Sequence, residues 1–292
     1  MPEKLKIIEC PRDAMQGMHD FVPTDLKIEY INKLLEVGFD TIDFGSFVSS
    51  KAIPQMRDTA EVLAGLNKST TKLLAIIANV RGAEDAVKHQ AITYLGYPFS
   101  ISETFQKRNT NATIQESLAN LNTIQQLTQN AGKKLVVYIS MGFGNPYGEE
   151  WNVDYAAGWI DKIQSMGVEI ISLADTVGVA KEADISYLFE GVIQKFPKVE
   201  FGAHLHTTPG NWQNKLAAAY DAGCRRFDTA IRGFGGCPMA TDKLTGNLAT
   251  ENAVQYLSGK LKNLTIDIQK LNDCILFSNR ICFSNAILTG FF

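Results

Sequence analysis

The sequence predicts an α/β fold, a single (β/α)8 TIM barrel with extra C-terminal helices. Eight short apolar, β-rich segments alternate with segments in which apolar residues recur at three- and four-residue spacing. This alternation is typical of a parallel sheet, and the count of eight favours closure into a barrel. An open, doubly wound sheet is the alternative, but no GxGxxG motif follows the first apolar segment.

The predicted elements follow one another without a low-complexity linker. The strands are expected at Leu5–Cys10, Thr41–Phe47, Lys72–Asn79, Tyr94–Ile101, Lys134–Met141, Glu169–Asp175, Glu200–His206 and Arg225–Ile231. The helices are expected near 24–37, 53–65, 82–91, 113–131, 153–166, 182–195 and 210–222. Thr24 is a candidate N-cap of the first helix, and Gly38 is a candidate for its end. Residues 1–292 are expected to form one domain, with the barrel to about residue 250 and closing helices at Glu251–Ser258 and Ile266–Ala286.

Composition excludes several classes of function. The chain has 292 residues, of which 45% are hydrophobic, and its net charge is −3, so we expect no nucleic-acid-binding or membrane-binding surface. The five cysteines are scattered and show no CxxC spacing, which favours reduced thiols over a disulfide framework. We read no targeting segment and no membrane-spanning run, and therefore expect a cytoplasmic protein.

Polar residues gather at the predicted carboxyl ends of the strands, where barrels of this type carry their active sites. These residues are Arg12 and Asp13 after the first strand, Asp43 and Ser46 on the second, Asp175 and Thr176 on the sixth, His204 and His206 on the seventh, and the loop 233–237 after the eighth. Independent segments thus send polar side chains to one rim, which indicates a functional site.

A divalent metal site is one interpretation of this rim. His204 and His206 alternate along a strand, so both imidazoles face the same side. Asp13 offers a carboxylate oxygen and Asn247 an amide oxygen, and such a mixed donor set suits Mg²⁺ or Mn²⁺. Each residue also has a structural interpretation. The histidines could fill polar space or bind an anion, Asp13 could stabilise a turn, and Asn247 could begin a capped helix.

The glycines at 233, 235 and 236 directly precede Cys237. Glycine tolerates unusual backbone angles, so this loop could close over a substrate and deliver the Cys237 thiol. A buried structural thiol beside a tight turn is the alternative. The other four cysteines are expected in the core.

Several motifs together resemble one family. The segment Leu5–Gln16, with its Arg-Asp pair, resembles the opening strand of 3-hydroxy-3-methylglutaryl-CoA (HMG-CoA) lyases. The other matching segments follow in the same order: Ser46–Lys51, Pro54–Met56, Ser102–Phe105, Asp175–Val179, Gly233–Met239 and Gly246–Glu251. The resemblance runs from about residue 5 to residue 260, and the Gly-Cys-Pro loop is its lyase-specific part.

The resemblance implies a carbon–carbon lyase that cleaves HMG-CoA, or a close 3-hydroxyacyl-CoA analogue, to acetoacetate and acetyl-CoA, as in leucine degradation. It implies metal ligands at Asp13, His204, His206 and Asn247, with His204 or Asp13 as the base for the substrate hydroxyl. Arg12 would stabilise the enolate, and Cys237 would transfer a proton from the lid. Asp43 stands where the lyases usually have glutamate. Gln16, Ser46, Asp175 and Thr176 are candidate substrate contacts, and a homodimer is expected.

Three positions depart from the family pattern. Thr207 replaces the acid that follows the second histidine, Asp43 is one methylene shorter than glutamate, and Gly17 replaces an asparagine. Loss of an acid that supports metal ligands typically costs about 10–100-fold in affinity or activity. Two alternatives therefore stay open. One is a related Claisen-type synthase, although the chain lacks the extra C-terminal region of such enzymes. The other is a catalytically impaired barrel that only binds acyl-CoA.

Overall fold

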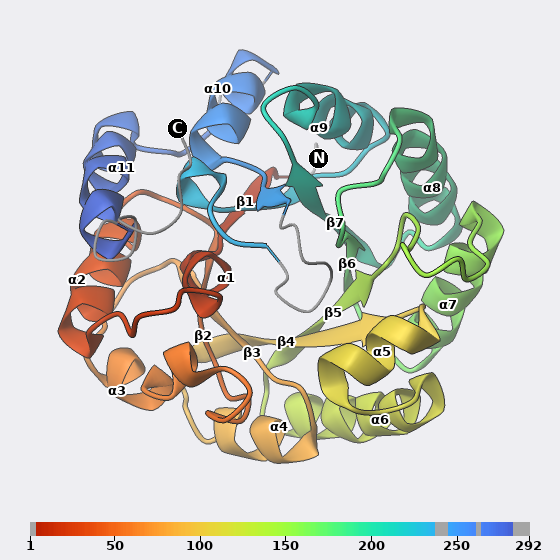
Figure 1. Ribbon diagram of the computed structural model, residues 1–292, viewed down its shortest axis with the longest axis horizontal. Helices are drawn as coiled ribbons and strands as arrows, with labels where there is room; N and C mark the ends of the chain where they lie inside the picture. The colour runs from red at the N-terminus through yellow and green to blue at the C-terminus, as the bar shows by residue number, and fades with distance from the viewer. Residues whose placement is uncertain (1–3, 237–244, 261–263, 283–292) are drawn as a thin grey trace.

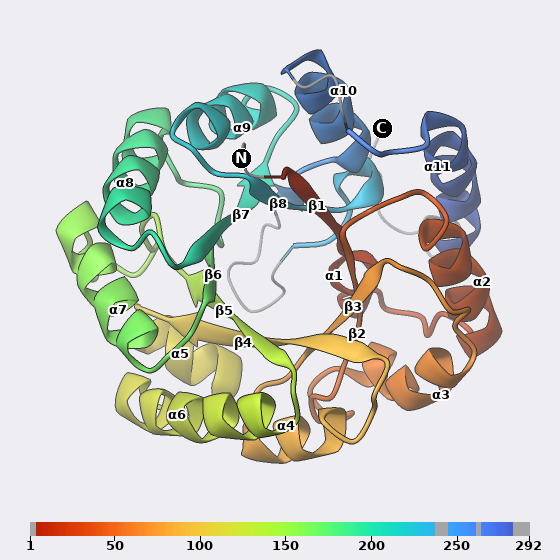
Figure 2. The same ribbon diagram turned by 180° about the vertical axis from the view of Figure 1, so that it is seen from behind.

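The computed structural model describes residues 4–236, 245–260 and 264–282, and they form a closed barrel of parallel strands inside a ring of helices (Figure 1). The barrel strands are β1 (Lys6–Glu9), β2 (Thr41–Ser46), β3 (Lys72–Ile76), β4 (Ile92–Ser100), β5 (Lys134–Ser140), β6 (Ile170–Asp175), β7 (Glu200–Thr207) and β8 (Arg226–Thr229). Each strand pairs in parallel with the next, and β8 pairs back onto β1 through the register Lys6↔Arg226. The predicted (β/α)8 barrel is confirmed, and the view from behind shows the same closure (Figure 2).

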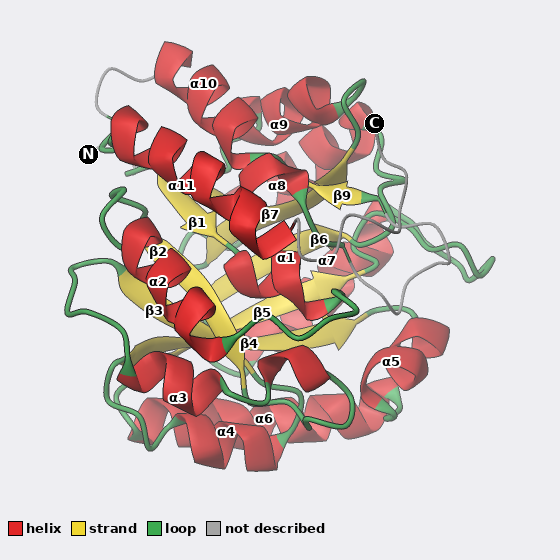
Figure 3. Cartoon of the chain, turned by 60° about the vertical axis from the view of Figure 1, so that its left-hand side comes forward, coloured by secondary structure: helices red, strands yellow, loops and turns green. Residues whose placement is uncertain are grey.

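The helices lie outside the strands (Figure 3). They are α2 (Thr24–Leu34), α3 (Thr59–Ala64), α4 (Val80–Ala86), α6 (Ile114–Asn130), α7 (Val153–Ser165), α8 (Glu182–Lys195), α9 (Trp212–Asp221), α10 (Thr250–Lys260) and α11 (Ile268–Cys282). Helix α10 packs on α9, and α11 packs on α2, so these two helices complete the ring (Figure 1). Helix α10 begins at Thr250, where we expected the barrel to end and the closing helices to begin. In the part of the chain that the structure describes, no helix is long and apolar enough to cross a membrane.

Four short elements were not predicted from the sequence. They are α1 (Pro11–Gln16), α5 (Glu103–Thr110), the 3₁₀ helix η2 (Ile231–Gly233) and the two-residue strand β9 (Gly246–Asn247). The helix predicted near 53–65 is divided into the 3₁₀ helix η1 (Pro54–Met56) and α3. Six residues are too few for α1 to show a helical period. Helix α5 is polar, and its start depends on the Ser102 side chain, which accepts a hydrogen bond from the Phe105 amide at 3.1 Å.

The start of α2 differs from the prediction. Helix α2 begins at Thr24, but its N-cap is Pro23, and no side chain of the described residues caps it. The Thr24 hydroxyl instead donates a hydrogen bond to Asp58 Oδ2 at 2.9 Å, which ties α2 to the start of α3. Gly38 follows the helix with φ of +98°, and a Cβ there would lie 2.3 Å from the Thr265 carbonyl oxygen. Only glycine fits this turn, because the C-terminal segment crosses it closely.

The apolar core has two main parts, and a small third cluster contains Phe105 and Met141. The larger part fills the layer between the strands and the helices. The smaller part lies inside the barrel and consists of Leu74, Tyr94, Val136, Tyr138 and Ile170. Each fully buried large aliphatic or aromatic side chain stabilises the fold by about 1.5–3 kcal/mol. The inner cluster fills the barrel around β3 to β6, and the side of the interior that is lined by β7 and β8 carries charged and polar side chains instead.

Candidate metal centre and active site

Residues that are far apart in the sequence line one cavity of about 150 Å³ at the carboxyl ends of the strands. Seven of the residues singled out from the sequence are among its walls: Arg12, Asp13, Gln16, Ser46, Thr176, His204 and His206. The predicted convergence on one rim is therefore observed for these side chains. Asp43, Asp175 and Asn247 are not among the lining residues. Asp43 accepts hydrogen bonds from Arg12, and Asn247 donates one to Asp13, both of which line the cavity. Asp175 directly precedes the lining residue Thr176.

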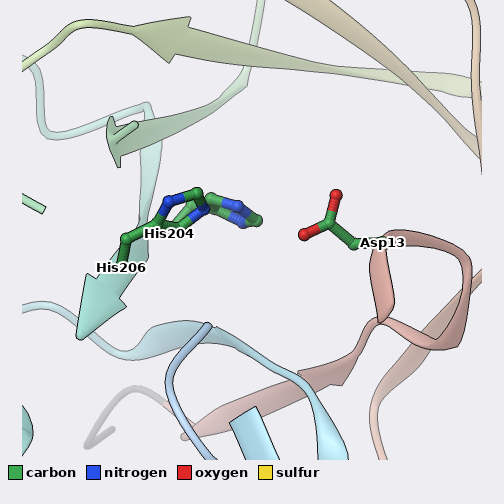
Figure 4. Close-up of side chains that lie close together, drawn as sticks. All are labelled: Asp13, His204 and His206. Atoms are coloured by element: carbon green, nitrogen blue, oxygen red, sulfur yellow. The ribbon is translucent and has the colours of Figure 1, made fainter. Parts of the chain in front are cut away.

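Asp13, His204 and His206 form a candidate metal centre (Figure 4). One ligand atom from each lies within 4.8 Å of the others, and both imidazoles extend toward the Asp13 carboxylate. The His204 and His206 rings come from the same face of β7, with their centroids 5.4 Å apart. Ligands about 2.1 Å from one ion lie about 3–4 Å apart, so a small inward movement would let these atoms share a cation.

Asn247 stands beside this group. Strand β9 pairs antiparallel with the end of β7 and sets Asn247 opposite His206. The Asn247 amide nitrogen donates hydrogen bonds to Asp13 Oδ2 at 2.7 Å and to the Phe234 carbonyl at 2.8 Å. The amide oxygen is therefore the atom that could bind a cation. Thr207, which replaces an acid of the family pattern, donates to the Asn247 carbonyl at 3.2 Å and so helps to hold β9 in place.

Arg12 links the cavity to Asp43. Its Nε donates to both carboxylate oxygens of Asp43, at 3.2 and 3.1 Å, and its Nη2 also contacts Oδ2. Its Nη1 donates to Asp13 Oδ1 at 2.8 Å. The shorter side chain of Asp43 therefore reaches Arg12 directly. The pairing of β2 with β3 shifts register between Asp43 and Gly45, so a local irregularity of the strand accompanies this contact.

The Arg12 guanidinium forms ion pairs with two buried carboxylates, those of Asp43 and Asp13. Burial disfavours the charged form of Arg12, but the charges of Asp43 and Asp13 outweigh it and raise its pKa, so Arg12 stays protonated. Burial also raises the pKa of Asp43, to about 6, although Arg12 opposes the shift. For Asp13, burial is outweighed by Arg12 and the two histidines, and the pKa of Asp13 is lowered. The site therefore carries an ionised Asp13 near neutral pH.

The two histidines differ in their proton affinity. Burial lowers the pKa of His206 to about 4, and the charge on His204 adds to this effect. His204 is partly buried, but a contact of 3.1 Å between its Nδ1 and Asp228 Oδ2 outweighs the loss of solvation and raises the pKa of His204. His206 is therefore neutral and ready to act as a ligand, whereas His204 is the better proton acceptor of the two.

The candidate substrate contacts divide into two kinds. Ser46 and Thr176 line the cavity, and Gln16 lines it while its amide donates to Asp13 Oδ1 at 2.7 Å. Asp175 is buried behind the cavity wall. Its Oδ1 accepts from the Ala180 amide at 3.0 Å, and its Oδ2 accepts from Lys215 Nζ at 2.6 Å. Both of its oxygens are thus engaged within the protein, which gives Asp175 a supporting position rather than direct contact with the cavity.

The glycine loop passes over the centre. Gly233, Gly235 and Gly236 have φ of +66°, +95° and +133°. A Cβ on Gly235 would lie 2.6 Å from the Asp13 carbonyl oxygen and 2.8 Å from Asn247 Nδ2. Glycine is needed at position 235 because the loop backbone lies directly against two candidate ligands. Cys237, the predicted proton donor of this loop, lies outside the described residues.

Sequence reasoning missed three buried residues around the centre. Asp228 bonds to His204, and the Tyr138 ring meets the His204 ring edge-on at 5.8 Å between centroids. Lys215 donates to the His206 carbonyl at 3.1 Å as well as to Asp175. No motif marks them. The only available signal was strand alternation, which places Asp228 on the inner face of β8, toward the histidines. The other two histidines lie outside the cavity lining: His19 is exposed, and His89 is partly buried after α4 and packs against Phe47.

The chain is similar in sequence and in fold to proteins named as HMG-CoA lyases. The chain is 34% identical over 273 residues to the rat protein named 3-hydroxy-3-methylglutaryl-CoA lyase, cytoplasmic, covering 93% of this chain and 79% of the relative. It is 35% identical over 286 residues to the hydroxymethylglutaryl-CoA lyase, mitochondrial, of Macaca fascicularis, covering 97% and 86%. An HMG-CoA lyase of Acinetobacter baumannii, solved with coenzyme A and 3-methylmalate, superposes with a TM-score of 0.88 at 31% identity, covering 99% and 97%.

The match to a family extends beyond the individual motifs. The HMGL-like family matches residues 4–275, which include every strand of the barrel, the candidate metal centre and most of α11. The family resemblance inferred from the sequence is thereby confirmed. Because the family match covers most of the chain, this protein belongs to the HMGL-like family.

Proposed function

We propose that the protein is a metal-dependent carbon–carbon lyase that cleaves HMG-CoA, or a close 3-hydroxyacyl-CoA analogue, to acetoacetate and acetyl-CoA. The observation that carries the proposal is the arrangement of Asp13, His204 and His206 within 4.8 Å beside the Arg12 guanidinium. The names of the relatives support the substrate class, and so does the coenzyme A in the related Acinetobacter structure.

The donor set fits Mg²⁺ or Mn²⁺. One ionised carboxylate, two imidazoles and an amide oxygen are donors that such ions accept, and the cavity leaves one side open for substrate oxygens. Asp13, His204, His206 and Asn247 would hold the ion. When bound, a divalent cation would acidify the tertiary hydroxyl of the substrate and fix its orientation.

The protein groups account for the remaining chemistry. His204 and Asp13 are the candidate acceptors of the hydroxyl proton, because both line the cavity and the pKa of His204 is raised. Cleavage of the C2–C3 bond places negative charge on the thioester oxygen of the departing enolate. Arg12, which stays protonated, supplies fixed positive charge for that oxygen, and Asp43 holds the guanidinium plane in position. In this proposal Cys237 protonates the enolate carbon and completes acetyl-CoA.

The test is a metal-dependent assay of acetoacetate release from HMG-CoA. We expect release that is lost on chelation and restored by Mg²⁺ or Mn²⁺. Cys237→Ala should abolish release but still bind Mn²⁺, because the thiol is outside the ligand set. Condensation of acetyl-CoA with an oxo acid, without cleavage, would instead identify a synthase. Binding of acyl-CoA with no turnover would identify an impaired homologue, and either result would contradict the lyase proposal.

Two further expectations belong with this proposal. The relatives include proteins named as cytoplasmic and as mitochondrial, and we propose the cytoplasm for this protein. The described cysteines are consistent with it, since Cys10, Cys224 and Cys274 are free and buried. We also propose a homodimer. Sedimentation equilibrium of the purified chain would test the dimer, and fractionation of the source cells would test the compartment.

A further inference from the structure

Asp228 lies directly under the candidate metal centre, inside the barrel. It pairs in register with His204 across β7 and β8, and its Oδ2 lies 3.1 Å from His204 Nδ1. The same Oδ2 accepts a hydrogen bond from the Ser172 hydroxyl at 3.2 Å. The Asp228 side chain is buried, so this contact is not shared with bulk water. A carboxylate in this position fixes which ring nitrogen of the histidine is free for another partner.

A second charged residue lies one layer deeper. Arg226 is two residues earlier on β8 and therefore projects to the same inner face. The Arg226 side chain is 1% exposed, and its Nη1 contacts Glu200 Oε1 at 3.3 Å. Strand β7 leaves room for it through Gly202, since a Cβ there would lie 3.0 Å from Arg226 Cδ and 3.2 Å from Ser172 Oγ. A side chain on residue 202 would compete with the arginine for this space.

Four polar atoms of Arg226, Asp228 and the neighbouring Tyr138 lack a hydrogen-bond partner among the described residues. They are Arg226 Nε, Arg226 Nη2, Asp228 Oδ1 and the Tyr138 hydroxyl oxygen, and all four are buried. Tyr138, Arg226 and Asp228 interact electrostatically with one another, so they face the same part of the interior. A buried polar group without a partner costs about 1–3 kcal/mol, and native proteins usually satisfy such groups with ordered water.

We infer that Arg226, Asp228 and Tyr138 form a binding site for buried water inside the barrel, and that this assembly positions His204 for the cation. Water bridges Arg226 Nε or Nη2 to Asp228 Oδ1 and to the Tyr138 hydroxyl. Asp228, held in this way, accepts the Nδ1 proton of the neutral His204 ring through Oδ2. The lone pair of His204 then resides on Nε2, on the side of Asp13. Asp228 is a positioning residue, and the inference rests on the proposed metal-dependent function.

The first test uses metal-free protein labelled with ¹⁵N at histidine. The chain has four histidines, so the tautomer of His204 can be assigned from the ring nitrogen shifts of the neutral side chain. We expect the Nδ1–H tautomer in the wild type. Asp228→Leu, which has a similar shape but no acceptor, should shift His204 toward a mixture or toward the Nε2–H tautomer. A wild-type tautomer in Asp228→Leu would overturn the inference.

The second test measures Mn²⁺ affinity by electron paramagnetic resonance. We expect Asp228→Leu to bind Mn²⁺ about 10–100-fold more weakly than the wild type, the usual loss when a ligand's supporting partner is removed. Asp58→Leu is the matched control. Asp58 is also a buried aspartate in an ion pair, with Lys27, but it does not contact the candidate metal ligands. An equal loss in both variants would show that Asp228 acts only on stability and would contradict the inference.

A milder variant covers the case in which Asp228→Leu does not fold. Ser172→Ala removes one hydrogen bond to Asp228 Oδ2 and should weaken Mn²⁺ binding by a few-fold at nearly unchanged thermal stability. Unchanged affinity in Ser172→Ala would count against the inference. In a crystal structure, we expect water within hydrogen-bond distance of both Arg226 and Asp228 Oδ1, and a dry interior would overturn the water site. If the wild type does not bind Mn²⁺, the proposed metal function fails, whereas the tautomer of the metal-free protein still decides the role of Asp228.

Discussion

Two buried ion pairs, Arg12–Asp43 and Lys27–Asp58, have similar local chemistry and different surroundings. Lys27 Nζ lies 2.7 Å from Asp58 Oδ1, and the Thr24 hydroxyl donates to the other oxygen of Asp58. One cation and one anion thus balance, and the pair joins α2 to the start of α3. Arg12 instead serves both Asp43 and Asp13, with two histidines next to Asp13. This region therefore holds one carboxylate more than its resident cation neutralises.

The difference shows what distinguishes a site from a structural contact. A buried ion pair alone is weak evidence for either stability or function, because desolvation offsets most of the attraction. An excess of buried negative charge, with two imidazoles directed at it, is complementary to a divalent cation. The Lys27–Asp58 pair has no such excess. The comparison predicts that substitutions in the two regions should separate activity from stability.

The largest loss of metal binding and activity is expected when Asp13 is replaced, because this region holds one carboxylate more than Arg12 neutralises. Asp13→Ala removes a candidate ligand and leaves Asn247 and Gln16 without their shared acceptor. We expect Mn²⁺ binding to be lost and kcat/KM to fall by at least about 100-fold, more than for a residue that only supports a ligand. Mn²⁺ titration and the acetoacetate assay would measure both. Asp13→Ala with wild-type Mn²⁺ affinity would exclude Asp13 from the ligand set.

Asp58→Asn should show the opposite pattern. Lys27 would keep a buried charge with its carboxylate partner removed, and breaking a buried pair in this way costs about 3–5 kcal/mol. We expect a corresponding decrease in the free energy of unfolding, measured in urea, with kcat/KM within a few-fold of the wild type. A large loss of activity in folded Asp58→Asn would show that the two regions are coupled, contrary to the comparison.

The features of the fold and of the site that depend on local sequence were predictable. Apolar periodicity indicated the barrel, and the His-x-His alternation with the Arg12-Asp13 pair indicated the rim. The residues that complete the site depend on contacts over long sequence distances. Asp228 bonds to a histidine 24 residues away, and Asn247 reaches Asp13 across 234 residues through the unpredicted strand β9. No local pattern encodes such contacts.

The contacts of Thr24, Asp175 and Gly235 also depend on tertiary packing. Thr24 has the residue type of an N-cap, but tertiary packing directs its hydroxyl to Asp58. Asp175 lies at a strand end and Lys215 on α9 donates to its carboxylate, so its contact with substrate stays a prediction. Neither outcome follows from local sequence, because each depends on which helix packs beside the residue. From the sequence, Gly235 was predicted only to let the loop adopt unusual backbone angles. The structure shows that the backbone of Gly235 also lies close to Asp13 and Asn247.

Gly235→Ala tests how tightly the loop backbone fits the candidate ligands. The new Cβ would overlap the Asp13 carbonyl and Asn247 Nδ2 at a positive φ, so we expect a stability loss of about 1–3 kcal/mol and weaker Mn²⁺ binding. Gly132→Ala is the matched control, because its φ is +68° and nothing lies within 4 Å of its Cβ. The control should lose about 1 kcal/mol or less, with Mn²⁺ affinity unchanged. Equal Mn²⁺ affinities in the two variants would place the loop away from the ligands in solution.

Glu9 extends the comparison to a third buried carboxyl group, whose hydrogen-bond donors among the described residues are all neutral. It accepts a hydrogen bond from the Ile231 amide at 2.9 Å and contacts the hydroxyls of Thr229 and Thr250. Burial raises the pKa of Glu9 to about 8, although these hydrogen bonds oppose the shift. With no cation to hold the charge, Glu9 is expected to stay protonated in the folded protein near neutral pH, unlike Asp13.

The raised pKa of Glu9 sets the sign of a pH effect on stability. Between about pH 4.5 and pH 8 the folded state keeps a proton that the unfolded state releases, so the free energy of unfolding falls as pH rises. Glu9→Gln resembles the protonated side chain and lacks this contribution. We therefore expect its stability to improve relative to the wild type across this range, by at most about 1.4 kcal/mol per pH unit in urea unfolding. Parallel stability curves for the two proteins would mean that Glu9 is already ionised in the fold and that a buried carboxylate here needs no cation.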